Sequence, residues 1–164
     1  MFKRIRAWFS ASKQPAVKKI AFIDGDQPVP SVLAAYRQYV ANTSTETHLV
    51  RCLPVDAHPP RALRGDAVKD INTIYLRGYA SGKEVTDKYI AAMIQKAVFD
   101  GFNHITVISS DYDFFDIFKM ALQINPALEH ATMRLIVPKA EGKLAKTTNS
   151  TANIEVIKMQ SVEA

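Results

Sequence analysis

Residues 105–115 have the sequence ITVISSDYDFF, and this stretch gives the clearest indication of the fold. The β-branched apolar residues at 105–108 predict a buried strand, which stops at two serines. From Phe114 onward the apolar residues recur with helical spacing, so Asp111 and Asp113 are expected at a junction between a strand and a helix. In open α/β sheets, ligands bind at such carboxyl ends of strands.

A second expected strand, at residues 19–23, also ends in acids, because Asp24 and Asp26 follow it with Gly25 between them. Helix capping would explain one acid at such a junction, since a helix N-terminus favours negative charge. Pairs of acids after two strands are less well explained by capping, so we interpret them as one shared acidic site. Asp87 is expected in the first turn of a helix that starts beside the strand ends, so it could belong to the same site. Alternatively, it only interacts favourably with the dipole of its own helix.

Strand and helix patterns alternate along the chain and predict a three-layer α/β/α sandwich with a mainly parallel central sheet. Residues 54–66 hold three prolines and are expected to form an irregular or briefly helical connection, and residues 139–151 a loop or a weak short helix. The expected strands cover residues 19–23, 47–53, 72–78, 105–108, 132–137 and, at an edge, 154–159; the expected helices cover about 30–40, 85–99 and 114–124.

The composition fits one globular domain, with 164 residues of which 48% are hydrophobic and 23% charged. We expect a basic N-terminal arm at residues 1–17 and a single domain at residues 18–164. No apolar stretch is long enough for a membrane span. The single cysteine, Cys52, cannot form an intrachain disulfide, which is consistent with a cytoplasmic location.

The charge balance combines an acidic cluster with a basic chain, whose net charge is +5. Carboxylates repel a phosphate backbone unless divalent cations intervene, so this contrast favours a metal-bridged phosphate site. Hard carboxylate oxygens select Mg²⁺ or Mn²⁺. For Arg61, Arg64 and each lysine taken alone we favour an ordinary surface role. The side chains that could contact the phosphates of a bound RNA are Gln27, Arg61, Arg64, Arg77, Lys83 and Lys143.

Three motifs resemble, in order and spacing, those of the NYN domain, a branch of the PIN-like ribonuclease superfamily. They are FIDGD at residues 22–26, VTD at 85–87 and SSDYDF at 109–114, and the match spans about residues 18–137. The resemblance implies a PIN-like sheet, Mg²⁺ or Mn²⁺, and hydrolysis of RNA phosphodiesters to 5′-phosphate and 3′-hydroxyl ends. It also implies four residues as catalytic metal ligands: Asp24, Asp87, Asp111 and Asp113.

The chain departs from the family pattern at three positions. Gln27 stands where the family usually has Asn, Ser110 where it has Gly, and Met93 where many members have a second helix carboxylate. Because a thioether binds hard cations poorly, one ion is favoured over two. The sequence therefore predicts a metal-dependent endoribonuclease, with a catalytically weak or inactive RNA-binding module as the alternative. Whether the chain is a monomer or a homodimer stays open.

Other catalytic patterns fit less well. The chain has no Gly-rich phosphate loop, dinucleotide-binding fingerprint, G-x-S-x-G turn or Cys/His metal spacing. Asp24 and Asp26 also mimic the nucleophile and acid of haloacid-dehalogenase phosphatases, in which Asp24 would be phosphorylated. That family continues with a Gly-Thr turn, whereas Gln27 and Pro28 stand here, so we disfavour this third hypothesis.

Overall fold

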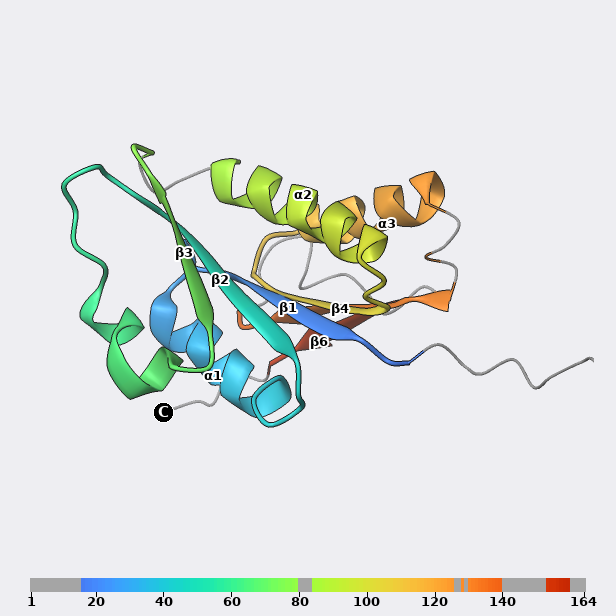
Figure 1. Ribbon diagram of the computed structural model, residues 1–164, viewed down its shortest axis with the longest axis horizontal. Helices are drawn as coiled ribbons and strands as arrows, with labels where there is room; N and C mark the ends of the chain where they lie inside the picture. The colour runs from blue at the N-terminus through green and yellow to red at the C-terminus, as the bar shows by residue number, and fades with distance from the viewer. Residues whose placement is uncertain (1–15, 80–83, 126–127, 129, 140–152, 160–164) are drawn as a thin grey trace, which may run out of the picture.

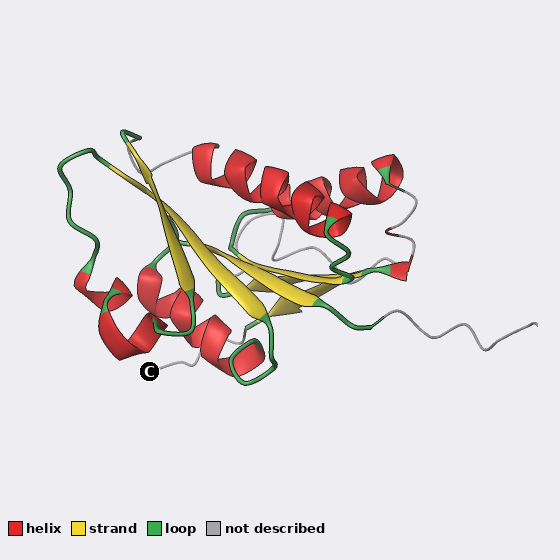
Figure 2. Ribbon diagram, viewed as in Figure 1, coloured by secondary structure: helices red, strands yellow, loops and turns green. Residues whose placement is uncertain are grey.

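The computed structural model describes residues 16–79, 84–125, 128, 130–139 and 153–159. Six strands form one sheet in the order β3-β2-β1-β4-β5-β6, and every neighbouring pair is parallel (Figures 1 and 2). The strands are β1 (Lys19–Asp24), β2 (Glu46–Leu53), β3 (Asn72–Arg77), β4 (His104–Ile108), β5 (Thr132–Val137) and β6 (Ile154–Lys158).

Helices cover both faces of the sheet, so the predicted α/β fold with three layers is confirmed (Figure 1). One face carries α1 (Val29–Tyr39) and two short 3₁₀ turns, η1 (Arg61–Leu63) and η2 (Gly65–Val68). The opposite face carries α2 (Val85–Phe99) and α3 (Asp113–Ile124), which pack against each other. Parallel strands are joined by crossovers, so each helix returns the chain to the end of the sheet at which the strands begin.

The central strands are apolar on both faces because each face is covered. Along β1, Ile20 and Phe22 pack into the core beneath α2 and α3, while Ala21 and Ile23 pack toward α1. Such continuous apolar runs are typical of parallel sheets between two helical layers. The predicted apolar face of α2 is confirmed, with its buried residues Thr86, Ile90, Ile94, Ala97 and Val98.

The order of the strands creates a crevice at the carboxyl ends of β1 and β4. From β1 the chain moves outward to β2 and β3, and it then returns to the other side of β1 to form β4 and β5. The connections that leave β1 and β4 therefore diverge, and ligands bind at this point in open α/β sheets. Asp24 ends β1, and Ser109 follows β4 directly.

The boundaries differ from the predictions by one or two residues at several ends. Helix α1 begins at Val29, with Pro30 in its first turn, and α3 begins at Asp113 instead of Phe114. The prolines at 59 and 60 precede η1, where a brief helical turn was one of the two expectations. The predicted arm at residues 1–17 and the loop at 139–151 lie mostly outside the described residues. Within the described parts of the chain, no helix is long and apolar enough to cross a membrane.

Candidate active site

Asp24 is a buried carboxylate at the end of β1, with only 3% of its surface exposed. Its Oδ2 accepts a 2.8 Å hydrogen bond from the Ser109 hydroxyl, and its Oδ1 accepts a 3.1 Å bond from the backbone N–H of Asp26. Burial raises the pKa of Asp24, while these two bonds and one from the Gln27 side chain oppose that rise. The carboxylate is therefore held in one orientation at the crevice.

Gly25 allows the chain to turn tightly against β2 directly after Asp24. Its N–H donates to the carbonyl oxygen of Val50 at 2.7 Å. A Cβ atom at Gly25 would lie 2.7 Å from both Leu49 Cδ2 and that same carbonyl oxygen, and 2.9 Å from Arg51 Cβ. Only glycine permits this approach, so the D-G sequence is a geometric requirement of the turn that positions Asp24.

Ser109 connects the two strand ends of the crevice. Its hydroxyl oxygen, which donates to Asp24, also accepts a 3.1 Å bond from the backbone N–H of Asp111. The Oδ1 atom of Asp111 in turn accepts a 3.0 Å bond from the backbone N–H of Asp113. Asp111 therefore does satisfy a donor at the start of α3, as the capping alternative proposed, and the same contact fixes it beside the other acids.

Asp26 ties the turn after β1 to β2 and α2. Its Oδ1 accepts a 3.1 Å bond from the backbone N–H of Cys52, and its Oδ2 accepts a 2.6 Å bond from the Thr86 hydroxyl. The Thr86 hydroxyl also lies 3.2 Å from the Cys52 sulfur. Since Asp87 follows Thr86, this network fixes the first turn of α2 at the strand ends.

The pKa of Asp87 indicates that the aspartates lie close to one another. Its carboxyl pKa is raised from 3.8 to about 7, first by burial and then by the negative charges of Asp24, Asp111, Asp113 and Asp26. Three segments that are far apart in sequence thus bring their acids close enough for each to act on Asp87. The structure brings together all four predicted catalytic aspartates.

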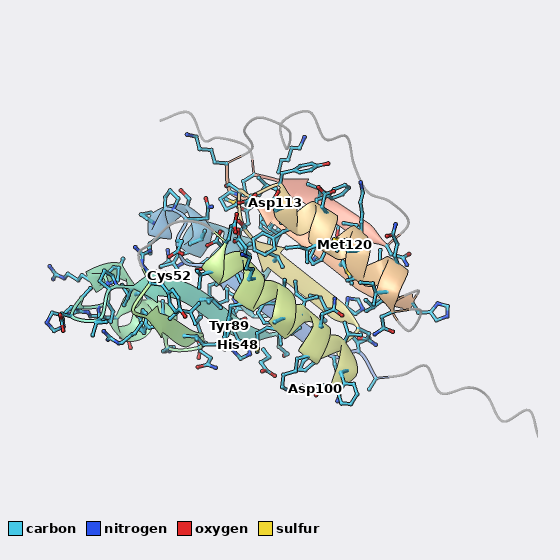
Figure 3. The ribbon with its side chains drawn as sticks, turned by 90° about the horizontal axis from the view of Figure 1, so that it is seen from above. His48, Cys52, Tyr89, Asp100, Asp113 and Met120 are labelled. Carbon is cyan, nitrogen blue, oxygen red and sulfur yellow. The ribbon has the colours of Figure 1, made fainter. Side chains whose placement is uncertain are left out.

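A groove of about 480 Å³ opens between α2 and α3 beside this cluster. Figure 3 shows Asp113 at the end of the helix pair near the cluster and Asp100 at the far end. The groove is lined by acidic side chains, by Lys88 and by a few apolar side chains; the other lining residues include Asp87, Asp113, Asp116, Ile117 and Met120. The groove offers a semi-apolar surface that leads to the carboxylates.

The donor set fits a hard divalent cation in its chemistry, since it consists of carboxylate oxygens. The mutual repulsion that raises the pKa of Asp87 is what a cation would offset. In the described part of the chain, however, no three His, Cys, Asp or Glu side chains are already arranged so that they could hold a metal ion. The predicted metal site therefore stays a prediction that requires the side chains to converge.

The predicted RNA-contacting arginines lie outside the acidic cluster. Arg77 ends β3 and its Nη1 donates to the carbonyl oxygens of Val55 and Ala57, at 2.9 and 3.1 Å. Arg64 donates to the Pro59 carbonyl oxygen at 2.9 Å. Both side chains thus hold the connection after β2, while Arg61 is exposed on η1. Lys83 and Lys143 lie outside the described residues.

Sequence reasoning did not identify Ser109 or Thr86 as site residues. A serine at a strand end is compatible with an ordinary turn, and a threonine in a first helical turn with an ordinary helix start. Their positions in the sequence could have identified them, because Ser109 directly follows a predicted strand and Thr86 directly precedes a predicted site residue, Asp87. Their partners are 85 and 60 residues away in sequence, so only the fold reveals the bonds.

Comparison of the chain with protein-family models, with curated proteins and with solved structures finds no match.

Proposed function

We propose that this protein is a metal-dependent endoribonuclease with a PIN-like sheet, which hydrolyses RNA phosphodiester bonds at the carboxyl ends of β1 and β4. The observation that carries the proposal is the raised pKa of Asp87, about 7, caused by burial and by four neighbouring aspartates. Such crowding of acids at a ligand-binding crevice has a cost in stability that a purely structural role does not explain.

Asp24, Asp87, Asp111 and Asp113 are the residues that would hold Mg²⁺ or Mn²⁺. When bound, such an ion neutralises charge on the phosphate and lowers the pKa of a water molecule. Met93 supports a single ion, since it is half-buried against the core beneath α2 and offers no hard ligand.

The chain's own residues would orient the reaction. The Ser109 hydroxyl donates to the Asp24 carboxylate and accepts from the Asp111 N–H, so it holds these two residues at a fixed position relative to each other. Asp87, at the first turn of α2, would act as a ligand of the ion or would orient the attacking water, whose proton passes to solvent. The water oxygen bonds to phosphorus, the O3′–P bond breaks, and the O3′ oxygen takes a proton, which leaves 5′-phosphate and 3′-hydroxyl ends.

An RNA-binding module without turnover is the second candidate, because no three metal-ligating side chains already converge among the described residues. Arg61, Arg64 and Arg77 would then supply much of the affinity, which would fall steeply with salt concentration. The phosphatase hypothesis is weaker. Asp24 would have to attack phosphorus, yet it is buried and each of its carboxylate oxygens already accepts a hydrogen bond.

The experiment is a cleavage assay on end-labelled single-stranded and structured RNAs, with Mn²⁺, Mg²⁺ or EDTA. We expect cleavage only with the metals, and at least a hundredfold loss, about the contribution of one charged catalytic group, in Asp111→Asn. Asp100→Asn, at the far end of α2, should cleave like the wild type. Cleavage that persists in EDTA, or in Asp111→Asn at full rate, would refute the mechanism. Metal-independent and salt-sensitive RNA binding without cleavage would favour the second candidate.

A further inference from the structure

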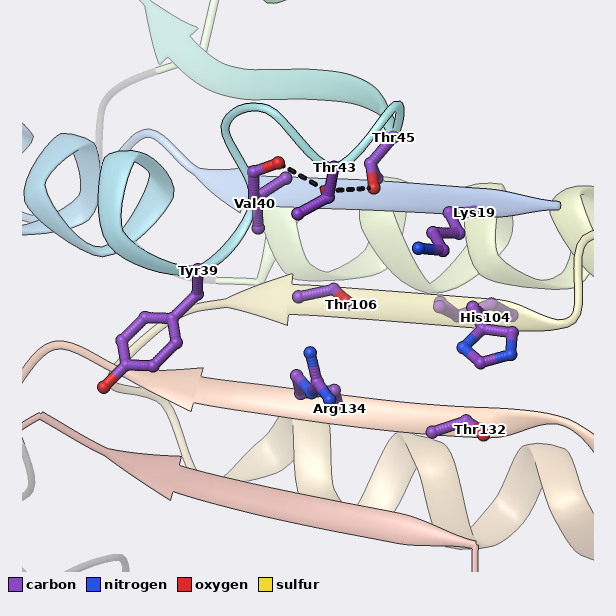
Figure 4. Close-up of a pocket in the computed structure, with 10 residues that line it drawn as sticks. Lys19, Tyr39, Val40, Thr43, Thr45, His104, Thr106, Thr132 and Arg134 are labelled. Atoms are coloured by element: carbon purple, nitrogen blue, oxygen red, sulfur yellow. Dashed lines mark hydrogen bonds between the residues drawn. The ribbon is translucent and has the colours of Figure 1, made fainter. Parts of the chain in front are cut away.

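A second pocket lies at the opposite edge of the sheet from the acids. It encloses about 230 Å³ on the α1 face, near the amino ends of β1, β4 and β5 (Figure 4). Three neighbouring strands and the turn after α1 contribute its walls. The polar residues that matter most are Lys19, Thr43, Thr45, His104, Thr106 and Arg134.

The strand register places three basic side chains on this one face. Lys19 of β1 is paired with His104 of β4, and Thr106 of β4 with Arg134 of β5. The pKa of His104 is lowered by burial and then by the charges of Lys19 and Arg134, so these cations act on the imidazole. The described residues that line the pocket include no acid.

Glu155 is the acid that adjoins this cluster, from β6. Its Oε2 accepts a 2.7 Å bond from Arg134 Nε. That bond uses one of the five N–H donors of the guanidinium group, so four donors are left for other acceptors. The ion pair is partly exposed, with 38% and 45% of the two side chains accessible, which limits how far it neutralises the pocket.

Hydroxyl groups from the turn after α1 complete the polar lining. The Thr43 hydroxyl donates to the Val40 carbonyl oxygen, so the 2.7 Å bond between the two threonine hydroxyls is donated by Thr45; both residues lie on the same side of the sheet as the basic side chains (Figure 4). Asn42 and Ser44 alternate with them and have φ angles of 66° and 52°. Asn adopts this left-handed conformation readily, whereas Ser does so at a cost, and the two threonines that alternate with these residues line the pocket.

The volume restricts the ligand. At about 30 Å³ for each water in the liquid, the pocket corresponds to about eight waters, and it is smaller than the roughly 300 to 1,000 Å³ of pockets that enclose drug-sized molecules. A phosphate group with a small substituent fits this volume, whereas a whole nucleotide would extend beyond it. The cationic donors of Lys19 and Arg134 suit a tetrahedral dianion with several acceptor oxygens.

We propose that the pocket formed by Lys19, His104, Arg134 and the threonines of the turn after α1 binds a phosphate group, either orthophosphate or the phosphate of a small monoester. This site is separate from the acidic cluster and does not depend on ribonuclease activity.

The test is a titration of the full-length protein with orthophosphate and with glycerol 3-phosphate, at constant ionic strength set by chloride. Proton NMR of the His104 ring, assigned with His104→Gln, and the melting temperature are the readouts. We expect saturable binding at millimolar phosphate, a higher Tm, and a raised His104 pKa because a bound anion favours the imidazolium. Binding of both ligands identifies a monoester site, and binding of orthophosphate alone identifies a free-phosphate site.

Variants locate the binding. Lys19→Gln and Arg134→Gln should each weaken phosphate binding about tenfold, the loss expected for one hydrogen bond between charged groups. Lys19 is exposed, so its variant remains informative if Arg134→Gln folds poorly. Arg37→Gln, on the exposed face of α1, and Asp111→Asn should bind phosphate like the wild type. Equal effects of chloride and phosphate, or wild-type binding by Lys19→Gln, would overturn the proposal.

Discussion

The Ser109 hydroxyl and the Asp24 carboxylate form a buried 2.8 Å hydrogen bond between residues 85 positions apart in the chain. The bond joins the end of β1 to the residue after β4, the two strands whose connections diverge. The same hydroxyl accepts a bond from the N–H of Asp111, so one serine fixes the position of Asp24 relative to Asp111.

Replacing Ser109 with alanine should destabilise the protein and disturb the site. A buried carboxylate that loses one donor costs about 1–3 kcal/mol, and the pKa of Asp24 should rise further because this bond lowers it. Urea denaturation measures the first effect, and Mn²⁺ affinity at neutral pH should fall.

Ser110→Ala is the matched control. Its hydroxyl accepts only from the Lys139 N–H among the bonds we describe, so a smaller loss of about 0.5–1.5 kcal/mol is expected. Equal losses in both variants would contradict the role of Ser109.

The stability of the metal-free protein should fall as pH rises from about 4 to about 7, in part because of Asp87. Its folded-state pKa of about 7 lies above its unfolded value of 3.8, so the folded state binds more protons between these values. This stabilising contribution is fully present below the unfolded pKa and is lost as pH rises through the folded pKa. Asp87→Asn should flatten this part of the stability profile and raise the Tm at pH 8, measured by thermal denaturation in EDTA. Asp66→Asn, an exposed aspartate on η2, should leave the profile unchanged. An unchanged profile in Asp87→Asn would contradict the crowding of the acids.

Gly25→Ala should be damaging because of contacts and not because of its backbone angles. The added Cβ would meet the Val50 carbonyl oxygen at 2.7 Å, and overpacking of this kind costs about 1–3 kcal/mol. The shift should also displace Asp24 and abolish stabilisation by Mn²⁺.

Gly65→Ala provides the contrast for this prediction. Gly65 has a φ of +72° and its Cβ would meet no atom within 4 Å, so backbone strain of about 1–2 kcal/mol is its only expected cost. Stabilisation by Mn²⁺ should survive in this variant. A Gly25→Ala protein that keeps its full Mn²⁺ response would contradict the geometric requirement at this turn.

Asp111→Asn should raise the Tm of the metal-free protein and reduce the further increase produced by Mn²⁺. The substitution removes one of the charges that act on Asp87, while the amide oxygen of Asn can still accept the bond from the Asp113 N–H. Melting curves of wild type, Asp111→Asn and Asp100→Asn, each with EDTA and with Mn²⁺, measure both effects. If Asp111 were only a helix-capping residue, its variant would be neutral or less stable and Mn²⁺ would not shift any of the curves.

Much of the fold could be predicted because hydrophobic patterns and turn residues act locally. The β-branched run at 105–108 and the acids after it were sufficient to place a strand end, and the parallel topology then implied that Asp24 and Asp111 share an edge. Helix α2 was predicted with its observed bounds, since its apolar spacing is regular.

Contacts between distant residues could not be predicted in this way. The bonds of Asp26 to Cys52 and Thr86 depend on how the turn after β1 meets β2 and α2. The basic pocket depends on strand register, because Lys19, His104 and Arg134 share a face only when β1, β4 and β5 align as they do. A one-residue shift in pairing would move a side chain to the opposite face.

Anomalous diffraction from a crystal soaked in Mn²⁺ tests most directly whether the gathered aspartates form a cation site. We predict one anomalous peak at the carboxyl ends of β1 and β4, in contact with the carboxylates of Asp24 and Asp111 and with at least one of Asp87 and Asp113. No peak at this position, or peaks only at exposed carboxylates such as Asp66, would contradict the claim.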